Sequence, residues 1–351
     1  RKAYADTYTI GLGAASGRDR GQTSSKDKVS ATIGSKAETD ADHNKLAAVN
    51  VTATNAPDSN LKGLGAAGGI LNIASQSFAE NNSENTAATT INGKWNISGD
   101  LKMSATVDES VRESARQGSG EIAGGSGVYV DNTIKGTTTS TIDKSATINA
   151  ANVDISAKNN IDTSGYDGDK YALEDYFGGG IVIDGLKSTL TYDRDAGVKV
   201  NGTVTTSGEQ NYTARTDGTL RNKVTATGGS IGGGTIAYST NTVDYDNTIE
   251  MDGTLNAGGA LNAEANDGIT LDTAALTEVG GGAEVLVGKA QNTITRTNRI
   301  ETGGTVKASE AITLNAGGTK EDLLTDNIQT KIETQVDTKN YSVIPISAND
   351  A

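Results

Sequence analysis

The sequence predicts an all-β fold, a solenoid in which short parallel strands stack coil upon coil. Three observations predict it. The composition lacks the large side chains of a thick core, apolar residues alternate with polar ones along short segments, and one pattern recurs about every 51 residues. Each observation is typical of thin, repetitive β-structure and untypical of a globular enzyme.

The composition indicates a thin aliphatic core. Hydrophobic residues make up 34% of the 351 residues and aromatic residues only 4%, too few large side chains to fill a deep interior. Thr, Val and Ile alternate with polar residues and Pro occurs only twice, which favours strands over a disordered chain. The chain has no cysteine, which excludes disulfides and thiolate sites.

The charge balance limits the classes of partner. The net charge is −14, whereas binding to phosphate backbones or to anionic lipid surfaces needs clustered Lys and Arg. No run of 18 apolar residues is present. We therefore expect no nucleic-acid partner and no direct membrane insertion.

A thirteen-residue pattern recurs along the chain and ends each time in alanine. The copies read GKWNISGDLKMSA at 93–105, SATINAANVDISA at 145–157, GTVTTSGEQNYTA at 202–214, GTLNAGGALNAEA at 253–265 and GTVKASEAITLNA at 304–316. The closing alanines are Ala53, Ala105, Ala157, Ala214, Ala265 and Ala316, at intervals of 52, 52, 57, 51 and 51 residues. This regularity predicts one continuous array over residues 1–351. Its repeats are 1–53, 54–105, 106–157, 158–214, 215–265 and 266–316, followed by a partial repeat 317–351.

Each copy of the pattern predicts two strands separated by a bend. In the copy at 304–316 apolar residues occupy every second position, which is the spacing of a strand with one buried face. Val306 and Leu314 should therefore point inward, and Lys307 and Thr313 outward. Small or turn-forming residues such as Gly258-Gly259 mark the bend between the two strands.

Upstream of each copy lie a glycine cluster and, in three repeats, an Asn-Thr pair. Asn132, Asn241 and Asn292 stand 24 or 25 residues before a closing alanine. Asparagines stacked at a solenoid corner would form a hydrogen-bonded ladder, although ordinary turn asparagines fit the same spacing.

The length of the repeat limits how many residues one coil is expected to contain. About six apolar stretches per repeat favour two coils of about 25 residues over three of about 17. With coils about 4.8 Å apart, about fourteen of them would form a rod about 65 Å long.

The repeated pattern resembles a known family. The alternation in 253–265 and 304–316 is similar to that of filamentous haemagglutinin-type adhesins, and the long unit looks most like the leukotoxin-family filamentous adhesins of anaerobic bacteria. The resemblance covers roughly residues 45–316. It implies a right-handed parallel β-helix, export through an outer-membrane pore by two-partner or autotransporter secretion, and a role in attachment or biofilm.

No catalytic centre, cofactor site or metal site is expected. The only histidine, His43, lies in the polar stretch TDADHNK, and nothing near it resembles a nucleophile elbow. Asp167 and Asp169 are weak candidates for metal ligands, and a solvated acidic loop is the preferred explanation for them.

The 57-residue repeat contains the one concentration of aromatic residues. Tyr166, Tyr171, Tyr176 and Phe177 lie beside several acids, a combination that binds sugars or anchors a protein partner. We expect a projecting partner-binding loop, with packing of these rings against the solenoid side as the alternative.

These observations predict the structural shaft of a large bacterial adhesin, secreted or attached to the cell surface. Its partner would be a protein or glycan on a host or bacterial cell, and it would act in attachment, biofilm or cell–cell contact. One alternative is a β-helix carbohydrate-active enzyme, a polysaccharide lyase or hydrolase, with Asp193 and Asp195 as its carboxylate pair. Another is an extracellular filament that self-assembles end to end.

Overall fold

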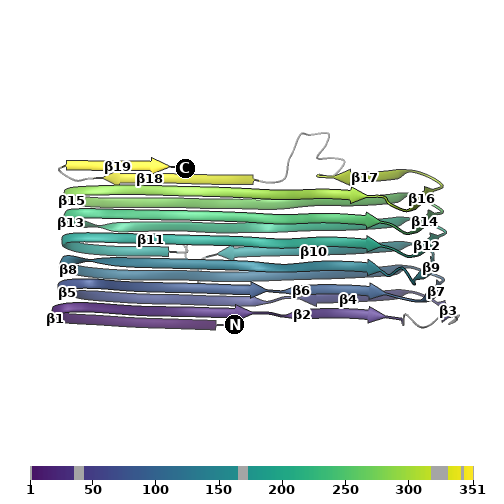
Figure 1. Ribbon diagram of the computed structural model, residues 1–351, viewed down its shortest axis with the longest axis horizontal. Helices are drawn as coiled ribbons and strands as arrows, with labels where there is room; N and C mark the ends of the chain where they lie inside the picture. Colours follow the sequence, from purple (N-terminus) through teal and green to yellow (C-terminus); the bar gives the residue numbers. More distant parts are fainter. Residues whose placement is uncertain (1, 35–42, 165–172, 318–330, 341–343, 351) are drawn as a thin grey trace.

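The computed structural model describes residues 2–34, 43–164, 173–317, 331–340 and 344–350. These residues form an all-β structure in which every pair of neighbouring strands runs parallel (Figure 1). The described residues include no helix long and apolar enough to cross a membrane.

Long strands alternate with short ones along the chain. The strands are β1 (Lys2–Ser25), β2 (Lys28–Ile33), β3 (His43–Leu46), β4 (Val49–Asn55), β5 (Asp58–Glu84), β6 (Thr86–Ile91), β7 (Lys94–Ile97), β8 (Leu101–Ile142), β9 (Thr147–Ala150), β10 (Val153–Ser164), β11 (Leu173–Val200), β12 (Thr203–Thr206), β13 (Gln210–Met251), β14 (Thr254–Ala257), β15 (Leu261–Glu301), β16 (Thr305–Ala308), β17 (Ile312–Ala316), β18 (Lys331–Asn340) and β19 (Ile344–Asp350). The long strands belong to one 13-stranded sheet, and the short ones β3, β7, β9, β12, β14 and β16 form a second sheet.

One repeat makes one coil. Gln210 pairs with Leu261 and Ala214 with Ala265, so a residue lies beside its equivalent 51 positions later. The expectation of two coils per repeat is therefore wrong. The apolar stretches that suggested separate coils are parts of single strands such as the 42-residue β13, which bends at its glycine cluster without losing its pairing.

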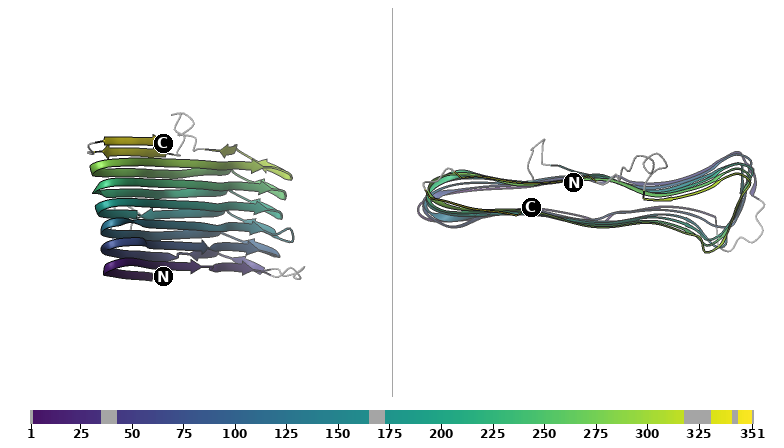
Figure 2. Two further views of the ribbon diagram at one scale, coloured as in Figure 1. Left: turned by 60° about the vertical axis from the view of Figure 1, so that its left-hand side comes forward. Right: turned by 90° about the horizontal axis from the view of Figure 1, so that it is seen from above.

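The described part is a flat slab. Its main path β1-β5-β8-β10-β13-β15-β17 holds seven strands, which at about 4.8 Å per step rise about 29 Å. Each arm of β13 holds about half of its 42 residues and spans about 70 Å. Seen from above, each coil consists of two long layers, closed at one end by the glycine bend and at the other by the short strands (Figure 2).

Apolar side chains between the two layers form separate clusters. One lies beside the short strands and includes Met103 and Ile155, a second lies mid-coil around Tyr192, and a third lies near the glycine bend around Leu173. Polar side chains fill the intervals between them, including the buried Asn159 and Asn222. The alternation of residues thus indicates which side chains point inward, although many of the inward side chains are polar.

The asparagine ladder is confirmed, in two segments. Asn81 Nδ2 donates to Asn132 Oδ1 at 2.9 Å, and Asn241 Nδ2 donates to Asn292 Oδ1 at 2.9 Å. Leu190 occupies the level between Asn132 and Asn241 and interrupts the ladder. The asparagines lie inside the coil and not at a corner, since Asn241 is fully buried.

The predicted burial of Leu314 is not observed. Leu314 is 48% exposed, whereas Ala263, its partner in the neighbouring strand, is fully buried. The reason is position, because β17 is the last strand of its path and pairs with β15 alone among the described strands. Inward orientation buries a side chain only where further strands cover it.

Candidate functional site

The aromatic segment of the longest repeat is only partly described. Tyr166, Tyr171, Asp167 and Asp169 lie outside the described residues, so the predicted partner-binding loop and metal ligands remain predictions. Tyr176 belongs to β11 and is 52% exposed.

Phe177 does not project as expected. It is 7% exposed and packs in the cluster near the glycine bend. A Cβ on Gly228, the residue paired with it, would lie 2.7 Å from the Phe177 ring. The ring therefore occupies the space that a side chain at Gly228 would take, and the absence of that side chain permits its burial.

The carboxylates of the enzyme alternative lie on the outer surface. Asp193 pairs with Asp244 of the next coil and Asp195 lies beside Asp246, and these four residues form an acidic patch. The amide of Asp246 donates to Asp195 Oδ1 at 3.3 Å, and partial burial together with the neighbouring carboxylates raises the pKa of Asp195. Within the part of the chain that the structure describes, no three His or acidic side chains converge as metal ligands.

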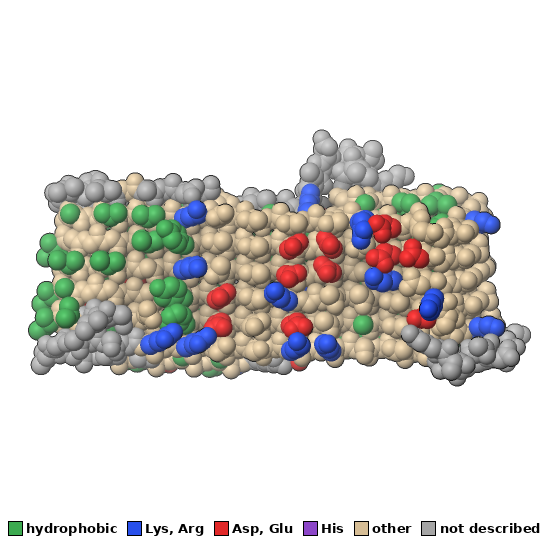
Figure 3. All heavy atoms as spheres, viewed as in Figure 1, with side chains coloured by type: hydrophobic (Ala, Val, Ile, Leu, Met, Phe, Trp, Pro, Cys, Tyr) green, Lys and Arg blue, Asp and Glu red, His purple; other side chains and the backbone are tan. Residues whose placement is uncertain are grey.

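A column of aromatic and basic side chains crosses the coils on the same face. It consists of Phe78, Tyr129, Lys187, Tyr238 and Lys289, each paired with the next, and we call it the aromatic column. All five occupy the same outward position of successive coils, and the constant register brings them together. Figure 3 views this face, where apolar, basic and acidic side chains follow one another away from the glycine bend.

Two rings of the aromatic column stack on each other. The centroids of Phe78 and Tyr129 lie 4.9 Å apart, with 13° between the ring planes. The guanidinium of Arg18 lies 4.7 Å from the Phe78 centroid, within cation–π range. Tyr129 leans over Gly127, where a Cβ would lie 2.9 Å from the ring. A side chain at Gly127 would therefore collide with the ring in this position.

A hollow of about 260 Å³ lies beside these rings, and we call it the aromatic hollow. Phe78, Tyr129 and Lys187 line one side of it, and Glu80 and Asp131 line the other. Arg18 and Arg20 line it as well, so the hollow combines an apolar ledge with three cations and two carboxylates.

The two carboxylates of the aromatic hollow differ in their surroundings. Glu80 is held by an ion pair with Arg20 and accepts a hydrogen bond from Gln22 at 3.4 Å. The pKa of Asp131 is raised, first because the group is partly buried and second because Glu80 is near, while Lys187 opposes the shift. Of the two, Asp131 is thus the carboxyl group that partial burial affects.

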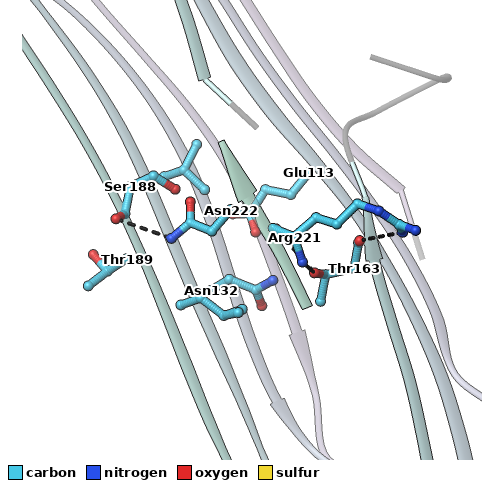
Figure 4. A pocket seen from close by; sticks show the side chains of 9 residues that line it. Glu113, Asn132, Thr163, Ser188, Thr189, Arg221 and Asn222 are labelled. Atoms are coloured by element: carbon cyan, nitrogen blue, oxygen red, sulfur yellow. Dashed lines mark hydrogen bonds between the residues drawn. The ribbon is translucent and has the colours of Figure 1, made fainter. Parts of the chain in front are cut away.

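The interior cavity in Figure 4 is a different kind of site. Glu113, Asn132, Ser188 and Asn222 line it, and its volume of about 10 Å³ has room for about one water molecule. The oxygens of Glu113 have no hydrogen-bond partner among the described residues, and burial raises its pKa well above the usual range. The cavity is therefore too small for a substrate, and its burial disfavours the charged form of Glu113.

The aromatic hollow could not be predicted from a local sequence pattern, because its residues lie far apart along the chain. Phe78 and Tyr129 are 51 residues apart, as are Tyr238 and Lys289. Comparing equivalent outward positions of all repeats would have revealed the column, once a repeat was known to be a single coil. Neither family models, nor curated proteins, nor solved structures gave a match to this chain.

Proposed function

We propose that this chain is part of a right-handed parallel β-helix that forms the structural shaft of a large bacterial adhesin, secreted or attached to the cell surface. The observation that carries the proposal is the constant register, in which Gln210 pairs with Leu261 and the whole of β13 follows β15 at the same offset. A stack of this kind lengthens by adding coils while each coil keeps the same neighbours. The handedness and the cellular setting rest on the resemblance to filamentous adhesins.

A shaft should accept additional coils. Duplication of residues 215–265 inserts one full repeat, so the variant should keep its strand content and melting behaviour and grow by about 4.8 Å along the stack. Duplication of 215–239 alone adds 25 residues, which is half a coil, and should disrupt the pairing that follows. Circular dichroism and small-angle scattering measure both outcomes. Loss of the fold in the full-repeat variant would contradict the shaft proposal.

We place a glycan contact of this adhesin at the aromatic hollow. A sugar ring combines an apolar face with hydroxyls around its rim. The rings of Phe78 and Tyr129 offer the matching apolar surface. Carboxylates accept hydrogen bonds from hydroxyls, and Lys187 donates them. The hollow lies on the outer face and is not enclosed, which suits a segment of a longer chain more than a small enclosed ligand.

Binding of oligosaccharides tests the glycan contact. Immobilised chain is exposed to neutral N-acetylglucosamine oligomers and to uronic-acid oligomers, and Tyr129→Ser should weaken binding at least tenfold. Tyr238→Ser is the matched control, because Tyr238 stands in the same aromatic column but does not line the hollow. Equal binding by Tyr129→Ser and the unaltered chain would show that the contact lies elsewhere.

The second candidate function is a carbohydrate-active enzyme. The observation that favours it is the position of Glu80 and Asp131 on adjacent strands beside the aromatic hollow, together with the raised pKa of Asp131. Incubation with the same oligosaccharides, followed by measurement of new reducing ends, separates the two functions. Cleavage that Asp131→Asn abolishes would favour the enzyme, and binding without cleavage would favour the adhesin.

A further inference from the structure

Two buried carboxyl groups lie on either side of the glycine bend in β11. Asp175 precedes the three glycines at 178–180 and Asp184 follows them, so the two side chains come from opposite arms of one strand. Asp175 is fully buried and Asp184 is 1% exposed. In such an interior little solvent is present to stabilise two negative charges.

One serine of the neighbouring coil contacts both carboxyl groups. Ser126 Oγ lies 3.0 Å from Asp175 Oδ2 and also contacts Asp184 Oδ1. The backbone N–H of Ser126 donates to the same Asp184 oxygen at 3.2 Å. Because Ser126 belongs to β8, which pairs with β11, these contacts join the two arms of β11 to each other and to the adjacent coil.

The contacts of Ser126 need one proton more than the serine provides. A hydroxyl group donates a single hydrogen bond, and an ionised carboxylate only accepts. Ser126 Oγ therefore satisfies one of two carboxylates and not both. If Asp175 is protonated, its O–H donates to Ser126 Oγ, and the Ser126 hydroxyl donates to Asp184 Oδ1. One carboxyl proton thus completes the chain of hydrogen bonds.

Other buried carboxyl groups of the interior have a serine each. Ser77 Oγ donates to Asp19 Oδ2 at 2.8 Å, and Ser230 Oγ donates to Glu284 Oε1. One hydroxyl proton completes each of these two contacts. At Ser126 one hydroxyl group serves two carboxyl groups, so its contacts alone depend on a further proton among these three serines.

The charged groups around the two aspartates favour the protonated form. Glu121 of β8 and Glu284 of β15 face them, and both are acidic. The residues that β13 pairs with the two aspartates are uncharged. Glu174, next to Asp175 in the sequence, forms an ion pair with Arg116 at 2.7 Å.

Of the two aspartates, Asp175 holds its proton more firmly. Burial, and after it the neighbouring Asp184, raises the pKa of Asp175 well above its usual range. Burial raises the pKa of Asp184 to about 7. As the pH rises, Asp184 therefore ionises first, which leaves the chain of hydrogen bonds intact, and Asp175 ionises later.

We propose that Asp175, Ser126 and Asp184 form a pH-sensitive clasp, which holds the glycine bend closed while Asp175 is protonated and releases it when Asp175 ionises. After release, two carboxylates compete for one hydroxyl proton, and their charges repel each other in a poorly solvated interior. The glycines at 178–180 add no side chain to the packing between the arms. The two layers should therefore separate locally at the bend, while the coil stays packed beside the short strands.

Hydrogen exchange of the backbone amides tests the clasp. After correction for the intrinsic pH dependence of exchange, protection of residues 175–184 should fall at least about tenfold between about pH 5 and about pH 9, because one ionisation changes an equilibrium by up to about tenfold per pH unit. The amides of β12, at the opposite end of the slab, should keep their protection. No loss at the bend, or an equal loss at β12, would overturn the proposal.

Substitutions separate the clasp from a general effect of buried charge. Asp175→Asn supplies a permanent donor, because its amide donates to Ser126 Oγ at every pH, so the bend should stay protected at about pH 9. Glu284→Gln is the matched control, since it removes another buried carboxyl group but leaves the contacts of Ser126 in place, and the pH dependence should remain. The reverse result for either variant would contradict the clasp.

A third variant tests the shared hydroxyl group itself. Ser126→Ala removes the link between the two aspartates, so protection of residues 175–184 at about pH 5 should fall at least about tenfold, towards that of the unaltered chain at about pH 9. Circular dichroism should show the same strand content as in the unaltered chain, because the backbone pairing of β8 with β11 does not use this hydroxyl. Unchanged protection in Ser126→Ala at about pH 5 would show that Ser126 does not hold the bend closed.

Discussion

Arg194 and Glu109 form an ion pair between two side chains that are both fully buried, joining β11 to β8 inside the slab. Asn85 Nδ2 donates to the same carboxylate at 3.0 Å. The guanidinium also donates to the backbone oxygen of Lys135 at 3.3 Å. The pair lies between two apolar clusters, where the interior is polar, and it links two neighbouring coils in addition to their backbone ladder.

Removal of one partner of this ion pair should be costly. Arg194→Met leaves the Glu109 carboxylate buried without its counter-charge, and we expect a loss of about 3–5 kcal/mol in the free energy of unfolding. Replacing both residues, with Arg194→Met and Glu109→Leu, should recover most of that loss. Urea unfolding of the two single variants and the double variant forms the cycle, and additive single effects would contradict a direct coupling.

The inward register predicts unequal effects at neighbouring residues. Met103→Asp places a charge at a position that is 1% exposed and should cost several kcal/mol. Lys102→Asp changes an exposed side chain of the same strand and should shift stability by less than about 1 kcal/mol. Thermal melts followed by circular dichroism compare the two, and similar losses would refute the register.

Two residues at the same register position, but in different strands of the stack, should differ in how much a charged substitution destabilises the protein. Ala263 is fully buried and Leu314, its partner in β17, is half exposed. Ala263→Asp should therefore destabilise by several kcal/mol and Leu314→Asp much less. Denaturant unfolding measures the difference, and a larger loss at Leu314 would mean that further strands cover β17 in solution.

The asparagine ladder predicts the effect of completing it. Leu190→Asn would stand between Asn132 and Asn241 and would join the two segments. Asn241→Leu does the reverse and leaves Asn222 and Asn292 short of a partner, at a cost of about 1–3 kcal/mol. Chemical denaturation should show the second variant as clearly the less stable, and the opposite order would show that the ladder does not stabilise the coil.

The buried carboxyls at the glycine bend predict pH-dependent stability. Burial raises the pKa of Asp184 from 3.8 to about 7, and burial beside Asp184 raises that of Asp175 further from its usual range. The folded state therefore binds more protons than the unfolded state between about pH 4 and 7, and stability falls as the pH rises through that window. Above it the contribution of Asp184 is lost completely.

Asp184→Asn removes one of these titrations. The groups facing Asp184 are Ser126, Asp175, Glu121 and Glu284, so part of the pH dependence stays with the other acids. Unfolding at pH 5 and pH 8 should differ less in Asp184→Asn than in the unaltered chain, by up to about 1.4 kcal/mol per pH unit across the window. An unchanged pH dependence would show that Asp184 is not the titrating group.

The sequence by itself determined the β class, the repeat and the inward face of the repeated pattern. The alternation at Val153, Ile155 and Ala157 specifies an inward face, and all three are fully buried. The spacing of Asn241 and Asn292 allowed a hydrogen bond between them, since residues one repeat apart occupy the same place in successive coils, but it did not exclude ordinary turn asparagines.

Only the tertiary structure decided how much chain makes one coil and which outward residues meet. Alternation with a period of two residues shows which side chains share a face of a strand. The same alternation results whether the strand ends at a glycine cluster or continues through it with a bend, so it does not reveal the length of a coil. Phe177 is buried because its neighbouring coil carries Gly228 beside it, and Leu314 is exposed because β17 has a single partner strand. Burial and contact between coils depend on what lies at the next level of the stack, about 50 residues away, and no local pattern contains that information.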